Sequence, residues 1–318
     1  MLKKGWLIVS LSVLMILAAC GTGGNNENAT NSGGEEEAST RTVSHAMGET
    51  EVPEKPEKVV ILTNEGTEAL LAMGVTPVGA VQSWLGDPWY EHISDDMKDV
   101  EVVGTESEVN LEAVAALKPD LIIGNKLRQE DIYDQLSAIA PTVYSETLKG
   151  DWQENFKFYA KALNMEDKGE EVMSAYTDRI DSMSEELGDQ LDQKVSVVRF
   201  LAGQTRIYYK DSFSGVILEQ LGFDRPKSQQ KEDFAEEVTK ERIPEMDGDE
   251  LFYFTYEAGD GEANSTAEEW TNDPLWNNLQ VVKDGNVHEV SDAIWNTSGG
   301  VISANLMLDD IEDVFLSK

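Results

Sequence analysis

The stretch EDKGEEVMSAYTDRIDSMSEELGDQ, residues 166–190, predicts one long helix between two similar halves of the chain. Apolar side chains recur along it at steps of three or four residues, which is the period of one helix face, at Val172, Tyr176, Ile180, Met183, Leu187 and Leu191. No proline interrupts the pattern, and such a helix would span roughly 37 Å at 1.5 Å per residue. We interpret it as a strut between two lobes; a long helix packed on a single domain is the alternative.

Both flanks of this stretch show strands that alternate with helices. Before it, the predicted strands are 58–62, 77–81, 100–104, 120–124 and 142–145, and the predicted helices are 65–73, 110–118, 129–140 and 151–164. After it, the predicted strands are 194–201, 205–210 and 250–256, and the predicted helices are 212–221, 239–246, 267–279 and 300–316. The pair Asp284-Gly285 predicts a hairpin between 281–282 and 287–290. Alternation of this kind is typical of parallel sheets covered on both faces.

The fold class predicted is therefore α/β, with two Rossmann-like lobes bridged by one long helix. The 318 residues are enough for two domains with separate cores. The predicted boundaries are a signal peptide at 1–19, a lipidated cysteine and flexible tether at 20–41, an N-terminal lobe at 42–164, the inter-lobe helix at 165–191 and a C-terminal lobe at 192–318.

The N-terminus resembles a lipoprotein signal. Two lysines precede an apolar run at 6–17, and small residues then lead to Cys20, the only cysteine of the chain. The resemblance implies cleavage before Cys20, a lipid on that cysteine, and a protein anchored on the extracytoplasmic face of the cell membrane. The alternatives are an ordinary secretory peptide with an incidental cysteine, or a transmembrane anchor, although the run is short for a membrane span.

The composition is strongly acidic, with a net charge of −36 at pH 7. Nucleic acid is excluded as a partner because phosphate binding requires a basic surface. A large acidic excess more often serves solubility, for instance in salty or alkaline surroundings, than binding. Basic residues that gather at strand ends are therefore worth explaining.

Seven basic or aromatic residues lie within or after predicted strands, and ligands of open α/β sheets bind beyond the carboxyl ends of the strands. They are Trp84, Lys126, Arg128, Arg199, Arg206, Tyr256 and Trp295. Four cations and three aromatic rings suit a large anionic ligand, although a surface ion pair is the alternative for any single arginine. This placement predicts that replacing Arg128 or Arg199 with alanine weakens binding and barely changes stability.

Metal binding by side chains and catalysis have little support in the sequence. His45, His92 and His288 lie far apart and show no paired ligand spacing. The chain has no Gly-x-Ser-x-Gly elbow, no Walker loop and no Gly-x-Gly-x-x-Gly, and Ser214 has no base near it in sequence. We expect a binding protein rather than an enzyme.

Several segments resemble the substrate-binding lipoproteins of ABC importers for ferric siderophores and vitamin B12. They are KVVIL at 58–62, GVTPVG at 74–79, NLEAVAALKPDLII at 110–123, DPLW at 273–276 and GNV at 285–287. The resemblance implies the class III periplasmic-binding-protein fold and a ferric siderophore as ligand, with iron held by the siderophore and no cofactor. VVRF at 197–200, RIY at 206–208 and AIWNTSGG at 293–300 resemble the hydroxamate and citrate-hydroxamate branch. A same-fold binder of haem or vitamin B12, or an exported siderophore esterase, is the alternative.

The same resemblance implies partners, namely two permease subunits with a cytoplasmic ATPase, and a monomeric receptor. Glu112 and Glu241 each lie in the first turn of a predicted helix, two residues after a polar residue, and the resemblance implies that they dock on the permease. Stabilisation of the helix dipole is the alternative for both, and Glu236, Glu237 or Glu245 is an alternative to Glu241.

Overall fold

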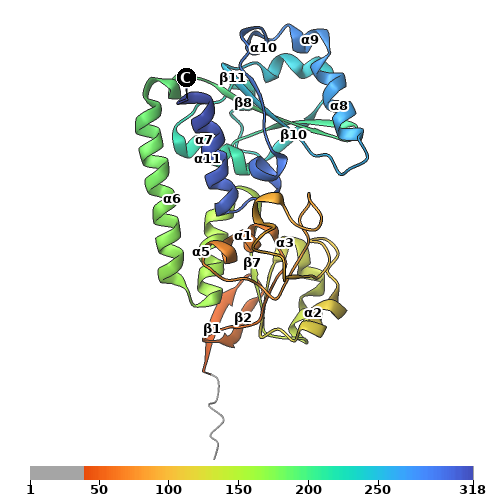
Figure 1. Cartoon of the computed structure of the whole chain (residues 1–318), viewed down its shortest axis with the longest axis vertical. Helices are drawn as coiled ribbons and strands as arrows, with labels where there is room; N and C mark the ends of the chain where they lie inside the picture. The colour runs from red at the N-terminus through yellow and green to blue at the C-terminus, as the bar shows by residue number, and fades with distance from the viewer. Residues whose placement is uncertain (1–38, 318) are drawn as a thin grey trace, which may run out of the picture. The chain divides into compact units, whose positions relative to one another are not determined.

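The computed structural model describes residues 39–317, so the predicted signal peptide, Cys20 and most of the tether lie outside the described residues. Residues 39–317 form two α/β lobes, each built on a five-stranded sheet, and a long helix runs beside both (Figure 1). The predicted fold class is confirmed. Within this range, no helix combines the length and the apolar character needed to cross a membrane.

The N-terminal lobe has a wholly parallel sheet in the order β5-β4-β3-β6-β7. Its strands are β3 (Val59–Ile61), β4 (Gly79–Ala80), β5 (Glu101–Val102), β6 (Leu121–Asn125) and β7 (Thr142–Ser145). Its α-helices are α1 (Asn64–Ala72), α2 (Leu111–Leu117), α3 (Lys126–Gln129), α4 (Tyr133–Ser137) and α5 (Trp152–Leu163), with single 3₁₀ turns at η1 (Glu91–Ile93), η2 (Glu130–Ile132) and η3 (Lys149–Asp151). Strands β3 and β6 are buried throughout, which explains their continuous apolar sequences.

An antiparallel hairpin, β1 (Thr40–His45) and β2 (Gly48–Pro53), precedes this sheet. The hairpin buries Val43 and Val52, and Nδ1 of His45 accepts a hydrogen bond from the backbone N–H of Tyr144 in β7 at 3.2 Å. Strand β1 begins at Thr40, before the lobe boundary predicted at residue 42.

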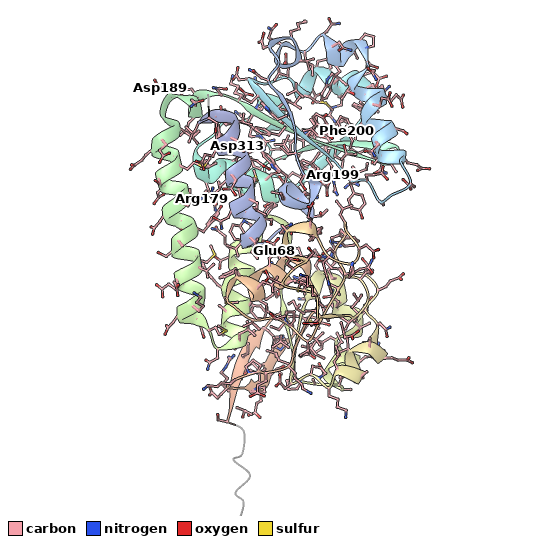
Figure 2. The ribbon with its side chains drawn as sticks, in the orientation of Figure 1. Glu68, Arg179, Asp189, Arg199, Phe200 and Asp313 are labelled. Carbon is pink, nitrogen blue, oxygen red and sulfur yellow. The ribbon has the colours of Figure 1, made fainter. Side chains whose placement is uncertain are left out.

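Helix α6 (Glu166–Leu187) is the predicted strut and ends three residues earlier than expected. Gly188 has φ +50°, and a 3₁₀ segment, η4 (Gly188–Asp192), follows. The buried face includes Tyr176, Ile180, Met183 and Leu187. From the same helix, Arg179 donates to the backbone oxygen of Asn305 at 2.8 Å and pairs with Asp309, both in α11 (Figure 2).

The C-terminal sheet is mixed, in the order β10-β9-β8-β11-β12. Its strands are β8 (Val195–Leu201), β9 (Gln204–Tyr208), β10 (Ala235–Val238), β11 (Glu250–Thr255) and β12 (Val287–Glu289). Its α-helices are α7 (Phe213–Leu221), α8 (Glu262–Thr271), α9 (Pro274–Asn277), α10 (Gln280–Asp284) and α11 (Val301–Phe315), with 3₁₀ segments η5 (Lys227–Gln229) and η6 (Lys240–Met246) and a π-helical turn η7 (Ala293–Thr297). Strands β8 and β9 form an antiparallel pair, and β10 was not predicted.

The hairpin predicted at Asp284-Gly285 is wrong. Residues 280–284 form α10, and Gly285 ends that helix in the left-handed conformation with φ +80°. The next strand, β12, runs parallel to β11. An Asp-Gly pair suits a helix end as well as a tight turn, and the tertiary packing selects the helix.

Part of the apolar core is shared by the two lobes. One cluster of buried side chains contains residues of both sheets and of α1, α5, α6, α7 and α11. Trp152 of α5, for example, contacts Tyr176 of α6 and Phe213 of α7 edge-on, with ring centres 5.1 and 6.0 Å apart. Two further clusters each lie within a single lobe, so the lobes also have cores of their own, and α6 and its neighbours join them through the shared cluster.

Candidate functional site

A cavity of about 360 Å³ lies between the two lobes. Segments that follow strands β3, β4, β5 and β6 line it on the N-terminal side, and β8, β9 and the segments after β11 and η7 line it on the C-terminal side. This is where ligands of open α/β sheets bind. The cavity brings together five of the seven predicted binding residues, namely Trp84, Arg128, Arg199, Arg206 and Tyr256.

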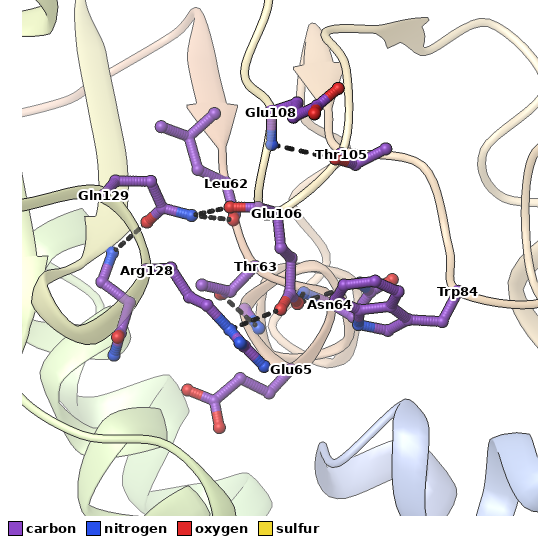
Figure 3. Close-up of polar contacts among 12 residues, drawn as sticks. Leu62, Thr63, Asn64, Glu65, Trp84, Thr105, Glu106, Glu108, Arg128 and Gln129 are labelled. Carbon is purple, nitrogen blue, oxygen red and sulfur yellow. Dashed lines mark hydrogen bonds and ion pairs between the residues drawn. The ribbon is translucent and has the colours of Figure 1, made fainter. Parts of the chain in front are cut away.

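Arg128 is held at the N-terminal wall by two neighbours (Figure 3). Its Nε lies 3.3 Å from Oε2 of Glu106, and its guanidinium lies 5.8 Å from the centre of the Trp84 ring. The other oxygen of Glu106 accepts from the backbone N–H and side-chain amide of Asn64, at 2.7 and 2.9 Å. Arg128 remains 40% exposed, so it can still donate to a ligand.

Gln129 fixes the loops that carry these groups, and sequence reasoning missed it. Its side chain is buried and donates to the backbone oxygens of Leu62 and Glu106, at 3.1 and 2.8 Å. Its Oε1 accepts from the backbone N–H of Asn125 at 2.8 Å. One amide thereby joins the segments after β3, β5 and β6, which positions the cavity wall (Figure 3).

Arg199 is buried at the C-terminal wall, near the end of the sheet that faces the other lobe (Figure 2). It makes a bidentate pair with Asp292, at 2.6 and 3.2 Å, and donates to the Tyr208 hydroxyl at 2.9 Å. Its guanidinium also lies 5.0 Å from the centre of the Tyr256 ring. Burial raises the pKa of Asp292, although the adjacent guanidinium lowers it. Removal of Arg199 would leave Asp292 buried and unpaired, so the structure leads us to expect a loss of stability instead of the small change expected from the sequence.

Arg206 differs from the other two cavity arginines. Its guanidinium donates to the amide oxygen of Gln204 at 3.3 Å, and no carboxylate of residues 39–317 lies within ion-pair distance of it. Its side chain is half-buried at the cavity wall. Arg206 therefore offers the cavity a full positive charge.

Tyr256 and Trp84 connect the two walls directly. The hydroxyl of Tyr256, in the C-terminal lobe, donates to the backbone oxygen of Trp84, in the N-terminal lobe, at 3.2 Å. Both rings also lie beside an arginine. The predicted aromatic walls thus hold the cations in place.

Two predicted residues do not line the cavity. Trp295 is fully buried, stacks on Phe252 at 4.5 Å and donates from Nε1 to Asp310 at 2.7 Å, so it is a core residue. Lys126 pairs with Glu146 at 3.0 Å outside the cavity. A position after a predicted strand was therefore not sufficient to identify a cavity residue. Trp295 packs into the core from η7, and Lys126 is paired with Glu146.

The cavity also contains acidic groups that sequence reasoning missed. Glu65, in the first turn of α1, is buried, and its Oε1 accepts from the Tyr159 hydroxyl at 2.6 Å and from Nδ2 of Asn155 at 2.7 Å. Burial above all, with a smaller contribution from nearby Glu106, raises the pKa of Glu65 to about 8, although the hydrogen bonds from Tyr159 and Asn155 oppose the shift. Glu65 and Glu106 both follow predicted strands, so the rule that ligands bind beyond strand ends could have identified both.

A second buried carboxylate, Glu68 of α1, joins the lobes at the N-terminus of α11 (Figure 2). It accepts from the backbone N–H and hydroxyl of Ser303, at 2.8 and 3.1 Å, and from the Ser298 hydroxyl. It also lies 2.7 Å from Nε2 of His92. A carboxylate from one lobe thereby caps a helix of the other.

The serines and histidines of the described residues make no catalytic arrangement that we recognise. Ser298 and Glu68 both approach the same ring nitrogen of His92, Nε2, whereas a triad uses the two ring nitrogens separately. Ser214 is fully buried, and its hydroxyl has no partner among the described residues. His45 and His288 lie elsewhere, beside Thr50 and Glu250 respectively.

Glu112 and Glu241 are exposed and begin helices on different lobes. Asn110 caps α2 by accepting from the backbone N–H of Ala113 at 3.1 Å, as predicted, whereas the segment that carries Glu241 is a 3₁₀ helix. Arg242 engages both Glu236 and Glu245 at 2.7 Å, so these two alternatives to Glu241 are already paired.

Comparison with known proteins agrees with this architecture. The sequence pattern of the family described as periplasmic binding protein matches residues 59–293. The chain belongs to the periplasmic binding protein family. It is 54% identical over 319 residues to the probable siderophore-binding lipoprotein YfiY of Bacillus subtilis, covering 98% of this chain and 97% of that protein. It is 31% identical over 312 residues to the Fe(3+)-citrate-binding protein YfmC of the same organism, covering 96% of each.

Among solved structures, the periplasmic binding protein described here is similar to Staphylococcus aureus SirA complexed with staphyloferrin B. The identity is 38% and the TM-score 0.78, covering 86% of this chain and 98% of SirA. The similar proteins are binding proteins, and this one is likewise not an enzyme.

Proposed function

We propose that this protein captures a ferric siderophore between its lobes and delivers it to an ABC importer for iron uptake. The observation that carries the proposal is the inter-lobe cavity lined by Arg128, Arg199 and Arg206 and by two aromatic rings. Charge-assisted hydrogen bonds from guanidinium groups suit the anionic oxygens of such a complex, and the rings supply flat apolar walls. The siderophore itself holds the iron, so the protein supplies no metal ligand.

We propose a hydroxamate or citrate-hydroxamate siderophore. The unpaired charge of Arg206 supports a ligand that retains a free carboxylate, and the relatives named for Fe(3+)-citrate and staphyloferrin B are consistent with an anionic ligand. In our proposal Trp84, Lys126, Arg128, Arg199, Arg206 and Tyr256 form the binding surface, Lys126 at its rim; Trp295 supports the C-terminal lobe from the core.

A titration of the protein with ferric siderophores, haem and vitamin B12, followed by tryptophan fluorescence, tests this function. Trp84 lines the cavity, so a bound siderophore should quench its emission, and Trp84→Phe should remove most of the quenching. Selective quenching by vitamin B12, or a shift of the haem Soret band, would overturn the proposal.

Arg206→Ala is expected to weaken siderophore binding by about 1.5–3 kcal/mol, a typical contribution of a hydrogen bond to a charged group. The melting temperature should stay unchanged, because Arg206 has no carboxylate partner in residues 39–317. Isothermal titration calorimetry and thermal unfolding measure the two quantities. Lys227→Ala removes the same charge from an exposed position of the same lobe and should leave affinity unchanged. Equal affinities of both variants would show that Arg206 does not contact the ligand.

We further propose that Glu112 and Glu241 dock on the two permease subunits, which couple to a cytoplasmic ATPase, and that the receptor acts as a monomer. Both carboxylates are exposed, and each belongs to a different lobe. We place the protein on the extracytoplasmic face of the cell membrane, held by a lipid on Cys20, in keeping with the lipoprotein named among its relatives.

The double variant Glu112→Ala and Glu241→Ala is expected to bind the siderophore normally and to abolish uptake of radiolabelled iron by cells. Both side chains lie outside the cavity, so ligand affinity should not change. Replacement of Glu236 and Glu245 by alanine provides the control. Both are paired with Arg242, so their loss should leave iron uptake unchanged. If uptake persists in the double variant and only its melting temperature falls slightly, the two glutamates merely stabilise their helices.

A further inference from the structure

The hydrogen bonds of Glu65 are unequally divided between its two oxygens. Oε1 accepts from both Tyr159 and Asn155, whereas Oε2 has no hydrogen-bond partner among the described residues. Glu65 is only 7% exposed, and it lines the inter-lobe cavity. Two donors on one oxygen and none on the other fit a neutral carboxylic acid, in which Oε1 is the carbonyl and Oε2 carries the proton.

The charges around Glu65 favour this neutral form. Glu106 and Asp151 lie close enough to oppose its ionisation, and burial opposes it more strongly. Two of the three cavity guanidinium groups are already paired with other carboxylates, Arg128 with Glu106 and Arg199 with Asp292. The other groups that surround Glu65 or face it across the cavity are Glu68 on its own helix, Tyr159, Arg206 and Tyr256.

The proton on Glu65 therefore decides the charge of the cavity. Three guanidinium groups against the carboxylates of Glu106 and Asp292 leave one net positive charge while Glu65 is neutral, and none once it ionises. An ionised Glu65 would also turn an acceptor towards the ligand instead of a donor. Both effects would weaken the binding of an anionic ligand.

We propose that Glu65 acts as an uncharged acid that donates a hydrogen bond from Oε2 to an anionic oxygen of the bound ligand, so that binding requires one retained proton. This inference rests on the proposed function, because it takes the ligand to be a ferric siderophore. It makes Glu65 a specificity-determining residue that favours anionic oxygens and makes affinity dependent on pH.

The test compares wild type with Glu65→Gln in the full chain. Glutamine keeps the shape, accepts at Oε1 and donates from Nε2, so it mimics the protonated acid permanently. The probes are a ferric citrate-hydroxamate siderophore, the class proposed above, and ferric staphyloferrin B, the ligand of the SirA complex. Calorimetry between pH 6.5 and 9.5 gives affinity and proton uptake. Above pH about 8, the affinity of wild type should fall about tenfold per pH unit relative to the variant, and only wild type should take up a proton on binding. Glu91→Gln, at an exposed position outside the cavity, should behave as wild type.

A second measurement needs no ligand. The infrared difference spectrum of wild type minus Glu65→Gln should show the carbonyl band of a protonated carboxylic acid at pH 7, and the band should disappear with a midpoint near pH 8. Absence of this band at pH 7, or identical pH dependence of binding in both proteins, would overturn the inference and leave the proposed function intact. Failure of wild type to bind ferric siderophores at any pH would instead overturn the proposed function, and this inference with it.

Discussion

Arg199→Ala is expected to destabilise the protein by about 3–5 kcal/mol, the usual cost of removing one partner of a buried ion pair. Asp292 is 3% exposed, and Arg199 supplies both hydrogen bonds of its bidentate pair. Without the guanidinium, the carboxylate must either stay charged and unpaired or take up a proton, and both alternatives cost free energy. Urea denaturation followed by circular dichroism measures the loss.

A double variant separates stability from binding. Arg199→Met combined with Asp292→Leu replaces the pair by apolar side chains of similar volume, which is often neutral or stabilising. We expect this protein to recover most of the lost stability but not the siderophore affinity. An Arg199→Ala protein that unfolds at the same urea concentration as wild type would contradict the assignment of Arg199 as a structural residue of the C-terminal lobe.

Ile180→Pro is the second substitution with a large expected effect. Ile180 lies in the interior of α6 and is 5% exposed, so proline removes a helix hydrogen bond and a buried apolar side chain together. The backbone effect alone costs about 3 kcal/mol or more. Since α6 packs against helices of both lobes, the kink should also change how the cavity walls face each other and weaken ligand binding.

The matched control for this substitution is Ile180→Ala, which loses the packing and keeps the backbone. It should cost about 2–5 kcal/mol and retain near-normal affinity at temperatures where it is folded. Thermal unfolding and calorimetric titration of both variants provide the comparison. Equal affinity of the proline and alanine variants would mean that α6 does not set the geometry between the lobes.

The periodicities of the sequence were sufficient to predict two α/β lobes and one long helix. The stripe from Val172 to Leu191 predicted α6, and the apolar runs at 58–62 and 120–124 predicted the strands observed as β3 and β6. These signals are local, because a helix face or a buried strand repeats within a few residues of itself. The rule that ligands bind at strand ends correctly placed Trp84, Arg128 and Tyr256 at one cavity. It succeeds because the carboxyl ends of parallel strands lie at one edge of a sheet.

Tertiary structure alone decided what each side chain does there. Arg199 and Asp292 are 93 residues apart, and Glu65 and Tyr159 are 94 apart, so no local pattern pairs them. Burial likewise makes Trp295 a core residue and raises the pKa of Glu65 to about 8. The positions of these two residues in the sequence indicate neither result. Charge state and orientation depend on partners and on exclusion of water, and these exist only after distant segments have packed.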